Sequence, residues 1–256
     1  MRALKFSPCG SFLASGTCSS PYLVHIWDRR GRQTWLTGHN SPISFLSFSS
    51  HGKYLASTEF NHEDDKTIRL WPTNSTRLPQ QSDKTLRGHH TSIIICLDFS
   101  SHDRKSLASG DYLAIKLWNV EQEVCIYTFD HLNGSIQSLF FPAADEGYTC
   151  TFVTSRGTLI RTCWNDLSGI TSDIVDMPGL GEVQRSAFSH CGSLLAASPH
   201  HGYTLTLYNM RTMTVVQRLS NRKNIGMSSF LLFHPIAKRW SSTATITKSI
   251  FVKYMI

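Results

Sequence analysis

Histidine, serine and aspartate, the three residue types of a hydrolytic triad, occur together twice in this sequence. The two groups are His39, Ser57 and Asp65, and His89, Ser109 and Asp111. In such a triad the serine attacks a carbonyl carbon, the histidine takes its proton and the aspartate orients the histidine. The serine then lies on an exposed turn such as G-x-S-x-G, and the sequence has no stretch with that spacing. We therefore predict no catalytic residue, and we expect that the protein is not an enzyme.

The twelve histidines raise a second possibility, a metal site. Two pairs are adjacent, at 89–90 and 200–201. Neighbouring side chains on a strand point to opposite faces, so such a pair does not easily share one metal ion. The sequence also lacks both G-x-x-x-x-G-K-[ST] and G-x-G-x-x-G, the loops that bind phosphate groups. We predict no metal and no cofactor.

An internal repeat positions these polar residues. Six aromatic residues end similar short phrases, spaced by 44, 47, 46, 44 and 46 residues: Trp27, Trp71, Trp118, Trp164, Tyr208 and Tyr254. A phenylalanine precedes each of them by 19 to 23 residues. A sustained period near 45 indicates an array of supersecondary units that pack against one another.

Within one unit the segments have the pattern of strands. Residues 42–49 (PISFLSFS), 53–57 (KYLAS), 67–71 (TIRLW) and 84–88 (KTLRG) are short, rich in β-formers and separated by turns. Four strands per unit with little helical periodicity indicate a propeller blade. We predict an all-β propeller that forms a single domain, residues 1–256, with six blade-sized units ending near 28, 72, 119, 165, 209 and 256.

Two longer stretches resemble WD (WD40) repeats. They are LTGHNSPISFLSFSSHGKYLAS…DDKTIRLW and LRGHHTSIIICLDFSSHDRKSLASGDYLAIKLW. Both have the Gly-His pair, the LAS strand and the terminal tryptophan at the spacing of that family. The resemblance implies a buried structural tetrad of His, Ser, Asp and Trp in each unit. The residues that match it are His39, Ser57, Asp65 and Trp71, and His89, Ser109, Asp111 and Trp118.

The resemblance also implies a binding surface. In a propeller, the loops between the second and third strands share the narrower face with the loops before the inner strands. Aromatic residues and arginine are common anchors of interfaces. The candidate partner-binding residues in these loops are Tyr22, Phe60, His62, Tyr112, Arg156, His200, His201 and Tyr203. We expect a scaffold that binds a peptide or a partner domain there, as part of a multiprotein complex.

Charge leaves an alternative function open. The net charge is +7, and basic clusters occur at residues 29–32, 104–105, 222–223 and 238–239. Several of these clusters fall in loops of the wider propeller face, where they could bind nucleic acid or an anionic lipid. Acidic residues in the same loops, among them Asp28 and Glu121, dilute the positive field.

Composition also limits where the protein works. The sequence has no apolar run long enough to cross a membrane, and residues 1–16 lack the apolar core of a signal peptide. Its seven cysteines include no C-x-x-C pair, which favours a reducing compartment. We expect an intracellular protein, cytoplasmic or nuclear.

The ring of blades is expected to be incomplete. Met1 already occupies the first apolar position of an inner strand, and Tyr254 ends the sixth unit with too few residues left for an outer strand. We therefore expect either an open or strained six-unit ring that lacks the last outer strand, or a piece of a longer propeller.

Overall fold

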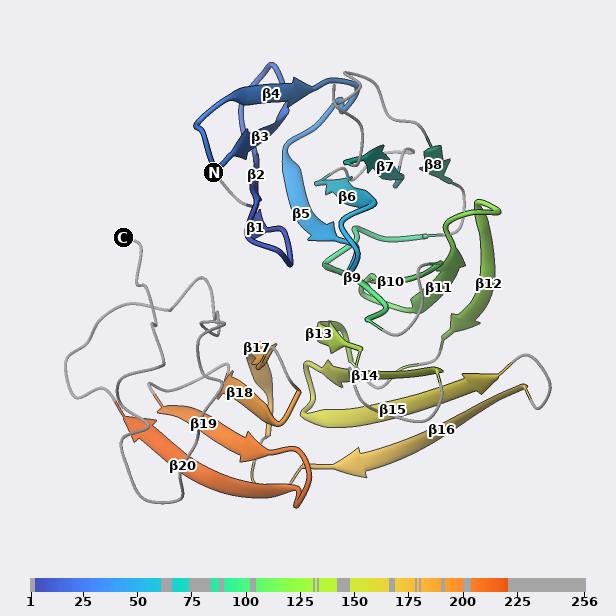
Figure 1. Cartoon of the computed structure of the whole chain (residues 1–256). Helices are drawn as coiled ribbons and strands as arrows, with labels where there is room; N and C mark the ends of the chain where they lie inside the picture. Colours follow the sequence, from blue (N-terminus) through green and yellow to red (C-terminus); the bar gives the residue numbers. More distant parts are fainter. Residues whose placement is uncertain are drawn as a thin grey trace. The chain divides into compact units, whose positions relative to one another are not determined.

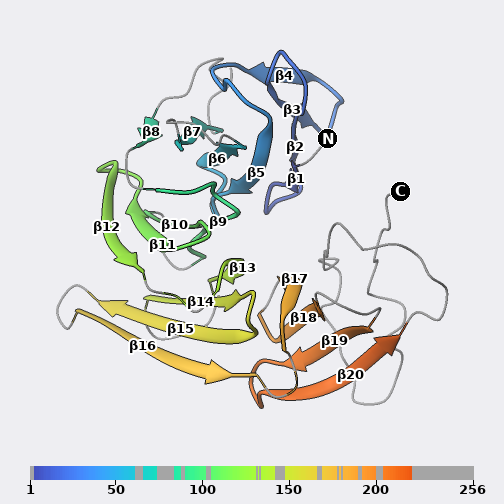
Figure 2. The same cartoon turned by 180° about the vertical axis from the view of Figure 1, so that it is seen from behind.

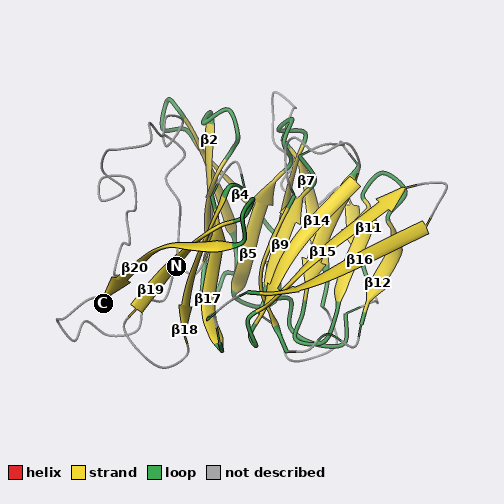
Figure 3. Cartoon of the chain, turned by 90° about the horizontal axis from the view of Figure 1, so that it is seen from below, coloured by secondary structure: helices red, strands yellow, loops and turns green. Residues whose placement is uncertain are grey.

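The computed structural model contains strands, turns and loops. It describes residues 3–60, 66–73, 84–87, 90–101, 105–130, 132, 134–141, 148–165, 169–177, 179, 181–189, 192–199 and 204–220. Every regular element in these ranges is a β-strand (Figure 3). The described part of the chain accordingly has no helix long and apolar enough to cross a membrane.

The strands form five four-stranded antiparallel sheets, and in each of them consecutive strands pair with one another (Figure 1). The chain divides into two compact units, unit 1 at residues 1–136 and unit 2 at residues 137–256. We describe the two units separately. The assignment of residues 1–256 to one domain stays a prediction.

Unit 1 contains the first three sheets. The first sheet consists of β1 (Ala3–Phe6), β2 (Phe12–Gly16), β3 (Val24–Asp28) and β4 (Gln33–Leu36). The second consists of β5 (Ile43–Phe48), β6 (Tyr54–Glu59), β7 (Ile68–Pro72) and β8 (Lys84–Leu86). The third consists of β9 (Cys96–Phe99), β10 (Ser106–Gly110), β11 (Ile115–Asn119) and β12 (Val124–Phe129). Strand β5 lies beside β1 and also beside β9 (Figure 1).

The core of unit 1 lies between neighbouring sheets. One face of the first sheet, with Ala14 and Ile26 at its centre, packs on Phe48, Leu55 and Trp71 of the second sheet. The opposite face of the second sheet packs in the same way on the third. Strand alternation explains this arrangement, because residues two apart share a face. Burial of each large apolar side chain contributes about 1.5–3 kcal/mol, so each sheet is stabilised mainly by its neighbours.

Unit 2 contains the other two sheets. The fourth consists of β13 (Ile136–Phe140), whose first residue belongs to unit 1, β14 (Tyr148–Thr154), β15 (Thr158–Asn165) and β16 (Gly169–Asp176). The fifth consists of β17 (Val183–Phe188), β18 (Leu194–Pro199), β19 (Thr204–Asn209) and β20 (Thr214–Ser220). Their shared core includes Val153, Leu159, Leu195 and Tyr208. Figure 2 shows the same sheets from behind.

Turns between the third and fourth strands follow one design. In three sheets the residue that ends the third strand, Asp28, Asn119 or Asn209, accepts backbone N–H groups two to four residues later through its side-chain oxygen. The chain then passes through the left-handed region, at Gly31 (φ 76°) in the first sheet and at Glu123 (φ 60°) in the third. Asx turns of this kind favour the tight reversal that starts the outer strand.

These sheets confirm the prediction of an all-β chain built from blade-sized, four-stranded units. The four predicted strands of residues 42–88 correspond to β5, β6, β7 and β8. Residues 221–256, where the sequence predicts a sixth unit, lie outside the described residues. The incomplete ring therefore stays a prediction.

Candidate functional site

The loops that follow the second strand of each sheet in unit 1 carry the candidate binding residues. Tyr22 lies in the β2–β3 loop, Phe60 in the β6–β7 loop and Tyr112 in the β10–β11 loop. The loop between β4 and β5 lies at the same end of the sheets, and a pocket there joins it to the β2–β3 loop. Two buried polar clusters, one in the second sheet and one in the third, hold this end in place.

The cluster of the second sheet joins three side chains. The indole N–H of Trp71 donates to Ser57 Oγ across 2.8 Å, and Nε2 of His39 lies 2.7 Å from the same oxygen. Neither Trp71 nor Ser57 is exposed to solvent, and His39 is 6% exposed. His39 belongs to the β4–β5 loop, so these contacts tie that loop to the sheet.

Glu59, at the end of β6, is the carboxylate beside His39. Its Oε2 lies 3.4 Å from Nδ1 of His39 and accepts the backbone N–H groups of Asn40 and Ser41, at 2.8 and 3.0 Å. Burial raises the pKa of the Glu59 carboxyl, but His39 and these two N–H groups outweigh burial and hold the pKa below its ordinary value. The resemblance to WD repeats implies Asp65 for this role, and Asp65 lies outside the described residues.

The cluster of the third sheet has four members. Nδ1 of His90 lies 2.9 Å from Asp111 Oδ2, Nε2 of His90 lies 2.6 Å from Ser109 Oγ, and the indole N–H of Trp118 donates to that oxygen. With the His90 proton on Nδ1, His90 donates to Asp111, Ser109 donates to His90, and Trp118 donates to Ser109. Both ring nitrogens of His90, the Ser109 hydroxyl and the indole N–H of Trp118 then each have a hydrogen-bond partner.

The histidine of this cluster is not the one that the sequence pattern predicts. The Gly-His dipeptide points to His89, which lies outside the described residues, whereas His90 makes the contacts to Ser109 and Asp111. The number of residues between the histidine and the phenylalanine of the inner strand explains the difference. His90 precedes Phe99 by nine residues, as His39 precedes Phe48, so both histidines have the same register to the sheet. The distance to the phenylalanine, not the dipeptide, identifies the residue.

Asp111 also shapes the loop that carries Tyr112. Its Oδ1 accepts the backbone N–H groups of Leu113 and Ala114, both at 2.7 Å. Burial raises the pKa of the Asp111 carboxyl, but the hydrogen bonds from His90 and from these N–H groups lower it below its ordinary value. The loop is thereby held with Tyr112 and Leu113 at the surface, where they are 47% and 61% exposed.

The geometry of the serines is unsuited to nucleophilic attack. Ser57 and Ser109 have no exposed surface, and each oxygen is held between an indole N–H and an imidazole nitrogen. A nucleophile has to reach a substrate carbon, which requires an exposed oxygen. Within the described ranges, no group of three His, Cys, Asp or Glu side chains could hold a metal ion.

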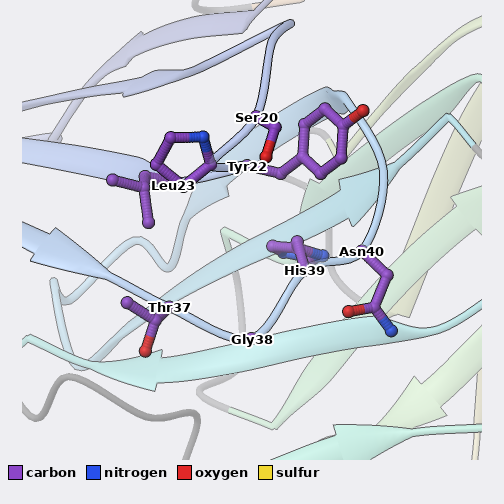
Figure 4. A pocket seen from close by; sticks show the side chains of 8 residues that line it. Ser20, Tyr22, Leu23, Thr37, Gly38, His39 and Asn40 are labelled. Carbon is purple, nitrogen blue, oxygen red and sulfur yellow. The ribbon is translucent and has the colours of Figure 1, made fainter.

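A pocket of about 400 Å³ opens between the first and second sheets at the same end. Figure 4 shows the side chains of Tyr22, His39 and Asn40 around it. Its apolar lining comes from Pro21 and Leu23 together with the Tyr22 ring, and its polar lining comes from Ser20 and the β4–β5 loop. The pocket thus has an apolar side and a polar side.

The remaining predicted binding residues fall in two groups. Arg156 is exposed in the β14–β15 turn of unit 2. Four others lie outside the described residues: His62, His200, His201 and Tyr203. The roles of all these residues stay predictions.

The repeats match a known family at three places. The family described as "WD domain, G-beta repeat" matches residues 1–28, 31–72 and 80–119, which include every strand of the first three sheets except β12. The chain thus contains three WD repeats within residues 1–119. Proteins built from this repeat are generally non-catalytic scaffolds for protein interactions.

Relatives of this chain share single stretches of it. The WD repeat-containing protein 26 homolog of Arabidopsis thaliana is 33% identical over 95 residues, which are 37% of this chain and 15% of the relative. Polyadenylation factor subunit 2 of Candida albicans is 27% identical over 46% of this chain and 20% of its own length. Eukaryotic translation initiation factor 3 subunit I of Candida albicans is 31% identical over 37% of this chain and 25% of its own length. The chain therefore spans only a small part of these relatives.

Proposed function

We propose that this protein is a non-catalytic scaffold that binds a peptide or a partner domain through the loop end of unit 1. By this end we mean the β2–β3, β4–β5, β6–β7 and β10–β11 loops. The observation that carries the proposal is the pocket lined by Pro21, Tyr22 and Leu23, with the exposed pair Tyr112 and Leu113 at the corresponding loop two sheets away. Exposed aromatic and aliphatic side chains on a rigid support are the usual anchors of a protein interface.

Rigidity of the loops supports the proposal. Glu59 fixes the backbone of Asn40 and Ser41, and Asp111 fixes the backbone on either side of Leu113. Binding loops that are already ordered lose less conformational entropy when a partner arrives, which favours affinity. The buried clusters thereby keep the binding loops ordered, although their own side chains are not proposed to contact the partner.

Charge pairing at the opposite end of the sheets counts against the alternative, a nucleic-acid or anionic-lipid binder. Lys53 and Lys105 lie 3.5 and 3.7 Å from Glu121 carboxylate oxygens, and Arg32 pairs with Asp28 at 2.7 Å. Cations that are already paired release fewer counterions from phosphate groups, so they contribute less to nucleic-acid binding. The alternative is kept as an outcome of the experiment below.

We place this scaffold inside the cell, in the cytoplasm or the nucleus, as part of a multiprotein complex. Two relatives support this placement, since their names describe subunits of a polyadenylation factor and of a translation initiation factor. The seven cysteines of the sequence include no C-x-x-C pair, which also favours a reducing compartment.

Selection from a random-peptide phage library tests the proposal. We expect the wild-type chain to enrich a peptide family that the double variant Tyr22→Ala, Tyr112→Ala no longer binds. The control variant Ile174→Ala changes an exposed residue of β16 and should retain binding. Equal binding by wild type and double variant would refute the loop end as the site. Binding that is lost with Arg30→Ala and falls steeply with salt would favour the anionic ligand instead.

A further inference from the structure

One wall of the pocket at the loop end is fixed by Thr17, which lies two residues after the serine of the first LAS tripeptide, Ser15. Thr17 Oγ1 donates to the carbonyl of Pro21 at 3.0 Å and accepts the backbone N–H of Leu23 at 2.8 Å. The backbone N–H of Thr17 donates to the Leu23 carbonyl, and the Thr17 carbonyl accepts the N–H of Ile43, both at 3.0 Å. These four hydrogen bonds hold the β2–β3 loop against the start of β5.

The facing wall is fixed from the same repeat position. Glu59 follows Ser57 by two residues, and its buried carboxylate accepts the backbone N–H groups of Asn40 and Ser41 in the β4–β5 loop. Both walls are thus ordered before a partner arrives, so only a small loss of conformational entropy accompanies binding. Any ligand of this pocket has to fit the groups that the two walls already present.

Asn40 presents its side-chain carboxamide at this pocket (Figure 4). Its backbone N–H is bonded to Glu59, whereas its side chain is exposed and has no hydrogen-bond partner among the described residues. A carboxamide offers both a donor and an acceptor. In an extended chain the N–H and C=O groups of one residue point to the same side, as in the bonded pairs of an antiparallel sheet. The Asn40 side chain can therefore bond to both groups of one extended residue.

The rest of the lining determines which side chain fits. Pro21 and Leu23 provide apolar surface together with the ring of Tyr22, and none of the eight lining residues is Asp, Glu, Lys or Arg. A charged side chain would lose hydration here without gaining an opposite charge. An aliphatic or aromatic side chain gains from the burial of apolar surface. The volume of about 400 Å³ suits one or two residues of a peptide.

We propose, resting on the function proposed for the loop end, that this pocket binds an extended segment of a partner protein. The Asn40 amide donates to the C=O of one residue of that segment, and Asn40 Oδ1 accepts the N–H of the same residue. An uncharged apolar side chain beside that residue packs against Pro21, Tyr22 and Leu23. Because the hydrogen bonds are made with the backbone, the pocket accepts segments of different sequence, provided that they are extended and carry the apolar residue.

Isothermal titration with a defined peptide tests this contact. The probe is the peptide that the wild-type chain enriches from the phage library, and an alanine scan of the peptide locates its apolar anchor. Asn40→Ala should raise the Kd of the probe about tenfold or more, because two hydrogen bonds are lost. The matched control is Gln122→Ala, which removes an exposed carboxamide from the β11–β12 turn and should leave the Kd unchanged. Circular dichroism and the thermal midpoint check that both variants fold.

A backbone analogue of the probe separates direct contact from an indirect effect of Asn40. An ester in place of one peptide group beside the anchor removes a single N–H, and it should weaken binding to the wild-type chain about fivefold. The same ester should not weaken binding to Asn40→Ala any further, because the contact is already absent there.

Three results would each overturn this assignment of the pocket: losses that add at every ester position, an unchanged Kd for Asn40→Ala, or a charged anchor. The double variant Tyr22→Ala, Tyr112→Ala then decides the proposed function separately, which stands if that variant still loses the probe. A wild-type chain that enriches no peptide would overturn both proposals.

Discussion

Trp118 donates its indole N–H to Ser109 Oγ across 2.7 Å, and neither side chain reaches solvent by more than 1%. Trp71 and Ser57 repeat this contact in the preceding sheet at 2.8 Å. The second and third strands of the two sheets therefore build the same buried hydrogen bond twice, with the two tryptophans 47 residues apart. The repetition identifies it as a property of the repeat and not of a single active site.

Truncation of the repeat tryptophan should be costly. Trp71→Ala removes a fully buried indole from the core between the first two sheets, and we expect a loss of about 3–5 kcal/mol in the free energy of unfolding. Trp35→Ala is the matched control, since that indole is half exposed, and should change it by at most about 0.5 kcal/mol. Urea denaturation of both variants measures the difference. Equal midpoints would show that Trp71 is not a core residue.

The two adjacent histidines of the third repeat should behave differently. His90→Ala leaves Asp111 buried without its partner, and we expect a loss of about 1–3 kcal/mol in the free energy of unfolding. His89→Ala should cost at most about 0.5 kcal/mol. Chemical denaturation of the two single variants gives both values. The opposite order would return the structural role to His89.

Acid should destabilise the protein through the buried carboxylates. The pKa of Asp111 is below its ordinary value of 3.8 in the folded chain, so the unfolded chain binds more protons at low pH. The contribution of Asp111 to stability is therefore complete above pH 3.8 and is lost as the pH falls through its folded-state pKa. Asp111→Asn removes this titration. We expect the unfolding free energy of the variant to depend less steeply on pH than that of wild type, and parallel curves would contradict the assignment.

The turn before β12 offers a test of backbone strain. Glu123 adopts a left-handed conformation (φ 60°) that glycine adopts at lower cost, as Gly31 does in the corresponding turn of the first sheet. Glu123→Gly should therefore raise the unfolding free energy by up to about 1 kcal/mol. Glu123→Ala also loses the 3.4 Å contact to Lys84 but keeps the strain, so it should not stabilise. Thermal melts compare the two variants, and equal stabilities would exclude strain at this position.

The repeat architecture could be predicted from the sequence because the spacing of strong signals carries it. Phe48 and Trp71 lie in the same cross-strand row of one sheet face, on either side of Leu55, and a separation of 19 to 23 residues recurs in every unit, so strand order and register follow from it. His39 and Ser57 could be assigned for the same reason. The Gly-His dipeptide points to His89, whereas the distance from Phe99 points to His90, which contacts Ser109. The role of His89 stays a prediction.

Other features of the site depend on three-dimensional neighbours and have no simple sequence signal. Glu59 lies two residues after Ser57, on the same face of β6. Only the fold brings it to His39 and to the N–H groups of the β4–β5 loop. The pocket at Tyr22 requires two loops that are separated by two strands. The exposure of Phe6 could not be predicted either, because Phe6 has the same repeat position as the buried Phe48 and Phe99.

One measurement tests the proposed binding role most directly. Isothermal titration gives the affinity of a library-selected peptide for wild type and for Tyr112→Ser, at low and at physiological salt. Tyr112 is exposed in a loop that Asp111 holds rigid, so truncation should weaken binding and leave the fold intact. We predict that the Kd rises about tenfold or more relative to wild type, with only a small effect of salt. An unchanged Kd for Tyr112→Ser, or a wild-type affinity that falls about a thousandfold between the two salt concentrations, would contradict the account.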